Sequence, residues 1–185
     1  MTTGGFEPEG AVEFDLPHGV VRGAGDRLMV VPATLLEEIA VTAGAAAAVT
    51  VARAIGTASG QRAALRLGGA DAARGATIEA VLSHLAGELA ITGVGAAYLE
   101  RWGRALVLVL ANTPVRDDVA VAALVEGALS AVVDRPVATL TLSRDTTGVR
   151  VLVASASALL RARELLDRGM AWGETLTRIQ ARGDA

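Results

Sequence analysis

Alternating apolar and polar positions predict two short strands between Pro136 and Ala154. Residues 137–143 and 149–154 each carry one better apolar face, because successive side chains of a strand point to opposite sides of a sheet. The intervening Asp145-Thr146-Thr147-Gly148 has turn chemistry, since Gly148 can adopt positive φ. The segment therefore predicts a β-hairpin.

A second apolar run shows no alternation. Residues 105–110 read Ala-Leu-Val-Leu-Val-Leu, and continuous apolar character indicates a strand buried on both faces. We predict that this run is the central strand of a sheet. Residues 96–102, followed by a turn at Gly103, predict its neighbour in a further hairpin.

Most of the remaining chain shows the periodicity of apolar residues that predicts helices. Thr77 and Asp117 are placed to cap two of the helices, because short polar side chains accept hydrogen bonds from the first free backbone N–H groups. The first helix is built largely from alanine, and small side chains let another helix approach closely. The predicted helices run from about 33 to 58, from 78 to the glycines at 93 and 95, from 117 to 134, and from Ser155 or Ser157 to about 182.

Near the amino terminus, residues 19–31 predict a hairpin with its turn at 23–26, and residues 68–75 predict a loop. The complete order predicts an α+β fold: a mostly antiparallel sheet of about four strands plus an N-terminal hairpin, packed by three helices, with a long C-terminal helix. We divide the chain into a disordered tail over 1–10, a single α+β domain over 11–155, and a C-terminal helix over 156–185. We expect this helix to pack on the domain or to serve in dimerisation.

Composition limits the partners of the protein. The hydrophobic content of 52% comes mostly from Ala and Val, and the uncharged run from Ile39 to Ala52 is shorter than the ~20 residues of a membrane-spanning helix. All 17 basic residues are Arg, the net charge is −3, aromatic residues make up 3%, and cysteine is absent. With no basic stripe, no stacking surface and no leader-like start, we expect a cytoplasmic protein that binds neither nucleic acid nor membrane.

Motifs for catalysis are missing from the sequence. A nucleophile elbow, a phosphate-binding glycine pattern and an inward-facing pair of carboxylates are all absent. His84 and Glu88 lie four residues apart on a predicted helix, but no third ligand of defined spacing accompanies them. We interpret them as a solvent-exposed pair opposite Leu82 and Leu85. We therefore expect no enzymatic activity, no catalytic residue, no metal and no cofactor.

Two aromatic residues are the main candidates for ligand binding. Tyr98 and Trp102 lie four residues apart on one predicted strand and hence on the same face. If this face meets the helices, they would line an apolar pocket and offer a hydroxyl and an indole N–H. The alternative is that they fill the core or cover a subunit contact. Together with His84, they form the predicted ligand-binding set.

Several short segments of the sequence resemble those of a known family. They are Gly-Val-Val-Arg at 19–22, Asp-Arg-Leu-Met-Val-Val-Pro at 26–32, Leu-Val-Glu-Gly-Ala-Leu at 124–129 and Arg-Pro-Val at 135–137. Over roughly 19–154 the chain resembles the 4-vinyl reductase domain family. That family includes ligand-sensing domains of hydrocarbon-responsive regulators, and is similar in structure to TRAPP tethering subunits and haem nitric-oxide-binding domains. The family's cysteines around the last hairpin are absent from 143–149, so neither a metal nor a haem role carries over.

The resemblance implies a bacterial, regulatory role. Our first hypothesis is a non-enzymatic module that acts as a homodimer and binds or senses a small apolar ligand, or binds a partner protein. One alternative is a structural or assembly protein, which a structure without an internal cavity near Tyr98 would favour. The other is a tetrapyrrole-related enzyme accessory, which would be coloured when purified from its native host.

Overall fold

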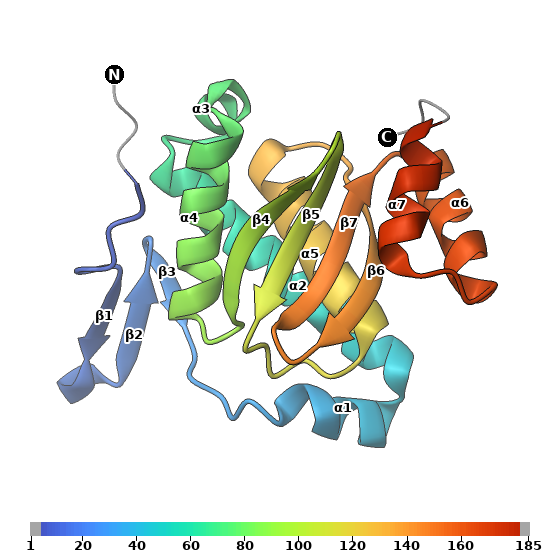
Figure 1. Ribbon diagram of the computed structural model, residues 1–185. Coiled ribbons are helices and arrows are strands. Elements are labelled where there is room, and N and C mark those ends of the chain that lie inside the picture. Colours follow the sequence, from blue (N-terminus) through green and yellow to red (C-terminus); the bar gives the residue numbers. More distant parts are fainter. Residues whose placement is uncertain (1–4, 182–185) are drawn as a thin grey trace.

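The computed structural model describes residues 5–181, which form an α+β structure as predicted (Figure 1). The strands are β1 (Val12–Asp15), β2 (Val20–Gly23), β3 (Asp26–Leu28), β4 (Ala96–Trp102), β5 (Ala105–Ala111), β6 (Ala138–Asp145) and β7 (Gly148–Ala154). The helices are α1 (Leu35–Ala43), α2 (Ala45–Arg66), α3 (Ala70–Gly75), α4 (Ile78–Ile91), α5 (Asp118–Val133), α6 (Ala156–Asp167) and α7 (Trp172–Ala181), with a short 3₁₀ turn η1 at Leu16–His18.

The main sheet has four antiparallel strands in the order β4-β5-β7-β6. β5 lies inside the sheet between β4 and β7, which confirms the prediction of a central strand. Leu108 is 2% exposed and faces one side, while the fully buried Val107 faces the other. The predicted hairpin forms β6 and β7, with Asp145 accepting hydrogen bonds from Thr147 and Gly148 in the turn.

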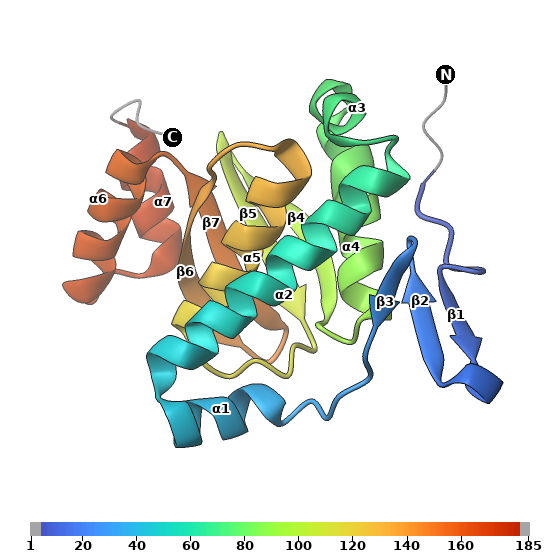
Figure 2. The ribbon, with the colours of Figure 1, turned by 180° about the vertical axis from the view of Figure 1, so that it is seen from behind.

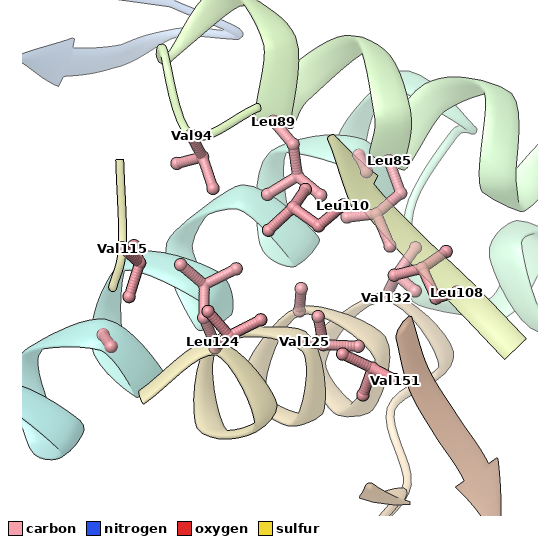
Figure 3. Close-up of a cluster of buried hydrophobic side chains, with 14 of the residues drawn as sticks. Leu85, Leu89, Val94, Leu108, Leu110, Val115, Leu124, Val125, Val132 and Val151 are labelled. Carbon is pink, nitrogen blue, oxygen red and sulfur yellow. The ribbon is translucent and has the colours of Figure 1, made fainter. Parts of the chain in front are cut away.

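Helices cover both faces of this sheet. α4 and α5 lie on one face, and α2 packs across the outer side of α5 (Figure 2). α6 and α7 cover part of the opposite face, where they bury Leu140, Leu152 and Val107. Strand periodicity divides the sheet residues accordingly: Leu108, Leu110 and Val151 point toward α4 and α5, into the larger apolar cluster (Figure 3).

The α2–α5 crossing depends on residues without side chains. A Cβ added at Gly56 would overlap the carbonyl oxygen of Leu124, and one at Gly60 would overlap that of Ala128. From the other helix, a Cβ at Gly127 would meet the backbone of α2. Close helix approach through small residues was predicted for this segment, and the structure confirms it. The same contact explains why α2 continues through Gly56 although glycine weakens a helix.

Two predicted continuous helices are wrong in detail, because each is interrupted at a glycine. The helix predicted over 33–58 is α1 followed by α2, and it breaks at Gly44, where φ is 90°. The predicted long C-terminal helix is α6 followed by α7. Gly169, with φ of 81°, reverses the chain so that both helices pack on the sheet in one cluster. Ser155 caps α6, whereas Arg182 lies outside the described residues.

The N-terminal region also differs from the predicted hairpin. β1 adds a third strand to it, in the order β1-β2-β3, because Val12–Asp15 pairs with β2. The return strand ends at Leu28, and Met29–Val31 form an exposed connection to α1 (Figure 1). The predicted loop at 68–75 contains the short helix α3.

The division of the chain at residues 10 and 155 stays a prediction. Part of the tail, residues 1–4, lies outside the described residues. In the described part, the N–H of Phe6 donates to the hydroxyl of Ser83 at 3.1 Å and its ring lies against Gly87 of α4. Within residues 5–181 no helix combines the length and apolar character needed to cross a lipid bilayer.

Candidate functional site

An apolar cavity of about 450 Å³ lies between the sheet and the helices at the α3 end of the molecule. Its walls come from α3, the start of α4, the end of α5 and the helix-facing sides of β4, β5 and β7. Volumes of roughly 300–1,000 Å³ are typical of small-molecule sites. The cavity is lined by Ala73, Arg74, Ala76, Ile78, Val81, Leu82, Leu99, Leu106, Leu108, Leu129, Val133, Arg135, Val137 and Val153.

Local features of the sequence determine which residues form the walls of the cavity. The Thr77 side chain accepts a hydrogen bond from the N–H of Ala80 at 3.2 Å and begins α4 there, as predicted. Ile78, Val81 and Leu82 then share the helix face that lines the cavity. On the sheet, Leu99 of β4 lies opposite Leu108 of β5, so one face of the hairpin supplies the floor.

The mouth of the cavity carries two arginines, Arg74 and Arg135. Arg74 pairs with Asp71 on its own helix and, at 2.8 Å, with Asp134 at the end of α5. It therefore joins α3 to α5 beside the cavity. Asp134 ends α5 in the left-handed conformation, with φ of 49°, and Arg135 follows it.

The chemistry available in the cavity is limited to apolar contact and guanidinium hydrogen bonding. All lining side chains other than the two arginines are hydrocarbon. Hydrocarbon walls favour the transfer of an apolar molecule from water, at about 25 cal/mol per Å² of apolar area buried. The arrangement is suited to holding a small molecule and supplies no nucleophile or acid–base pair among its lining side chains.

The predicted solvent-exposed pair His84 and Glu88 is wrong, because both residues are buried. Glu88 is fully buried and accepts hydrogen bonds from Arg62 Nε at 2.8 Å and Arg66 Nε at 2.5 Å. Arg66 also donates to the carbonyl of Ala11 and lies over the Phe6 ring. This buried ion-pair cluster joins α2, α4 and the N-terminal segment.

His84 packs near the ion-pair cluster and away from the cavity. It is 9% exposed, its ring meets the edge of the Phe6 ring, and its buried Nδ1 has no hydrogen-bond partner within the described chain. No group of three or more His, Asp or Glu residues suited to a metal ion occurs in residues 5–181.

Tyr98 and Trp102 share one face of β4, as their spacing predicts, but it is the face opposite the cavity. Leu99, between them in register with Leu108, points to the cavity side. Tyr98 is 45% exposed and Trp102 is 43% exposed. Trp102 packs edge-to-face against Trp172 of α7, and its indole N–H donates to Glu100 at 3.0 Å. The structure therefore does not bring the predicted set together with His84.

A half-buried ion-pair network lies beside the Trp102–Trp172 pair. Arg150 donates to Glu100 and Asp145, and its guanidinium lies over the Trp172 ring. Hydrogen bonding to Glu100 is the main cause that raises the pKa of Arg150 above its usual value. The network joins β4, β7 and β6 across the face of the sheet that carries α7.

Arg74 and Arg135 were absent from the sequence prediction. Each lies at the end of a helix, where no periodicity marks a residue as facing a cavity. Only indirect evidence for Arg135 was present in the sequence. Arg135-Pro136 follows the end of a helix, and the apolar residues of that helix pack in the same core cluster as those of β5.

No protein-family model matches this chain, and no curated protein matches it either. Comparison of structures does find similarity. The phenol-responsive sensory domain of the transcription activator PoxR, solved with phenol, matches with a TM-score of 0.59 at 14% sequence identity. The match covers 78% of this chain and 85% of that chain.

The structural similarity concerns the fold of this chain. This chain shares the fold of a small-molecule sensory domain, and that neighbour is a domain of a regulator. At 14% identity the likeness concerns the arrangement of helices and strands.

Proposed function

We propose that this protein is a non-enzymatic module that binds a small apolar ligand in the cavity between the sheet and the α3, α4 and α5 helices. The observation that carries the proposal is the hydrocarbon lining of a cavity of about 450 Å³. For scale, an apolar cavity of roughly 150 Å³ holds benzene. The site is therefore large enough for a ligand of one or two rings or a short alkyl chain.

The structural neighbour supports a sensing role. The PoxR domain is phenol-responsive and was solved with phenol, and the shared fold makes small-molecule sensing the activity that this chain is best suited to perform. We infer in addition that the chain is a diverged member of the 4-vinyl reductase domain group without the cysteines of its last hairpin. A bacterial, cytoplasmic, regulatory role belongs to the same proposal.

A homodimer is part of the proposal, and exposed apolar side chains support it. Met29 is 81% exposed and Val30 is 76% exposed in the connection between β3 and α1. Phe14 and Leu16 are exposed on the nearby N-terminal sheet and η1. A second copy that covers these residues would remove their apolar side chains from water. Light scattering coupled to size exclusion tests this: Met29→Glu should lower the dimer fraction, whereas Leu160→Glu on α6 should not.

The assembly-protein alternative has one observation in its favour. Tyr98 is exposed and does not line the cavity, which is the outcome expected if its face serves a protein contact. The apolar cavity on the opposite face supports ligand binding instead. Calorimetry on the purified protein separates the two roles.

The experiment compares a filled cavity with an unfilled one. Ala76 lines the cavity, so Ala76→Phe should occupy it, whereas Ala54→Phe places the same side chain on the exposed side of α2. Phenol, 4-ethylphenol, naphthalene and octanoate are titrated into each variant by calorimetry. We expect saturable 1:1 binding of at least one probe to the unmodified protein and to Ala54→Phe, and none to Ala76→Phe. Absence of saturable binding to the unmodified protein, or its persistence in Ala76→Phe, would contradict the proposal.

A further inference from the structure

The polar side chains that line the cavity are both positively charged, which distinguishes this cavity from a site for a neutral ligand. Arg74 and Arg135 are the only lining residues with polar side chains among those of the described chain. A guanidinium only donates hydrogen bonds and carries a fixed positive charge. A ligand atom that accepts hydrogen bonds can therefore be satisfied here by a side chain, whereas a ligand donor meets no side-chain acceptor.

The two arginines are not equivalent. The Nη atoms of Arg74 are taken by Asp71 and by Asp134, the latter at 2.8 Å. The Arg135 side chain makes no hydrogen bond or ion pair within residues 5–181, although its backbone N–H donates to the carbonyl of Ser130. Its guanidinium is thus available to a molecule in the cavity without breaking an existing pair.

Helix dipoles do not decide the charge preference of the site. The amino end of α4, which favours an anion, lines the cavity at Ala76 and Ile78. The carboxyl end of α5, which favours a cation, lines it at Val133. Their effects oppose each other within one helical turn. The charge of Arg135 is then the main electrostatic feature that a bound head group meets.

We propose, on the basis of the ligand-binding role above, that the cavity takes a small amphipathic carboxylate. Its hydrocarbon part lies among Leu82, Leu99 and Leu108, and its carboxylate pairs with Arg135 at the mouth. Arg and carboxylate form two parallel N–H···O bonds, a geometry that adds specificity to charge. The carboxylate stays beside exposed residues, so it is partly hydrated and avoids the desolvation that a fully buried ion would require.

A matched ligand series tests the head group while keeping the hydrocarbon constant. Octanoate, 1-octanol and octylammonium are titrated by calorimetry at pH 7.5 into the unmodified protein. A charge-assisted hydrogen bond of about 1.5–3 kcal/mol corresponds to tighter binding of octanoate than octanol by roughly 10- to 150-fold. Octylammonium should bind the weakest of the three, because its donors face a guanidinium.

Variants then assign the preference to one residue. Arg135→Gln should remove the octanoate advantage and leave octanol binding within about twofold, while Arg135→Lys should keep part of it because it keeps the charge. Arg101→Gln is the control, since Arg101 is an exposed cation of β4 that pairs with Glu79 and does not line the cavity. It should leave all three affinities unchanged.

Two results would overturn the inference. One is equal or tighter binding of octanol or octylammonium in the unmodified protein, which would leave the proposed ligand-binding role standing. The other is an octanoate preference that survives Arg135→Gln. If none of the three probes binds, and phenol and naphthalene also fail, both the carboxylate specificity and the ligand-binding role are wrong.

Discussion

Replacing Glu88 by glutamine should destabilise the protein severely, although the two side chains have the same shape. Glu88 is fully buried, and its two oxygens accept from Arg62 at 2.8 Å and Arg66 at 2.5 Å. Glutamine keeps one acceptor and turns an N–H₂ donor toward a guanidinium that also donates. The Arg62 side chain, only 6% exposed, would then carry a charge with neither water nor a carboxylate to compensate it.

The magnitude follows from the burial. Removing one partner of a buried ion pair costs about 3–5 kcal/mol, because the remaining charge stays desolvated. For a chain of 185 residues, each kcal/mol lowers the melting temperature by about 2–4 °C, so the expected fall is roughly 6–20 °C. Urea unfolding followed by circular dichroism gives the free energy, and a thermal scan gives the temperature shift.

The matched control is Glu126→Gln on α5. Glu126 also pairs with an arginine of α2, Arg53, but the two side chains are 32% and 45% exposed. A solvent-exposed pair contributes about 0–1 kcal/mol. If Glu88→Gln and Glu126→Gln lower the free energy of unfolding by the same amount, the reasoning from burial is refuted.

Four further predictions concern the scaffold. Gly56→Ala should lower the free energy of unfolding by about 1–3 kcal/mol, because its Cβ has no room against α5. Gly173→Ala, in open space on α7, should instead raise it by about 0.5–1 kcal/mol in the same denaturation assay. Leu108→Asp should unfold the protein, since Leu108 is 2% exposed and an unpaired carboxylate there costs several kcal/mol; an unchanged melting temperature would contradict this. Asp145 should titrate in a carbon-detected NMR experiment with a pKa of about 2 instead of 3.8, because the Thr147 hydroxyl and N–H donate to its carboxylate. Since the folded pKa is the lower one, its stabilising contribution is present above pH 3.8 and is lost as the pH falls through about 2, and Asp145→Asn should abolish that dependence.

Structural features that depend only on residues a few positions apart, such as helix caps and turns, could be predicted. The cap at Thr77 depends on a backbone N–H three residues away, and the turn at Asp145 depends on residues two and three positions on. The unbroken apolar run of β5 directly indicated that this strand is buried on both faces. Helix interruptions at Gly44 and Gly169 were missed, because a glycine within a periodic apolar pattern is compatible with both continuation and a break.

Features decided by residues distant in sequence could not be predicted. Glu88 is buried only because Arg62 and Arg66 reach it from another helix, and nothing within α4 encodes that. Tyr98 and Trp102 were assigned to one face correctly. However, helices lie on both sides of the sheet, and periodicity alone does not say which side holds the cavity. Arg135 comes to the mouth because Asp134 takes a left-handed conformation, which the pattern does not specify.

The close crossing of α2 and α5 has a consequence for how distant relatives of this chain are recognised. Apolar positions in the core can exchange Leu, Ile, Val and Met while keeping the fold, so their identities fade quickly as sequences diverge. Gly56, Gly60 and Gly127 leave no such freedom, because backbone atoms of the opposing helix occupy the place of a side chain. We therefore expect a glycine pair four residues apart, together with one glycine in a later helix, to persist longer than the hydrophobic pattern in sequences that keep this helix crossing.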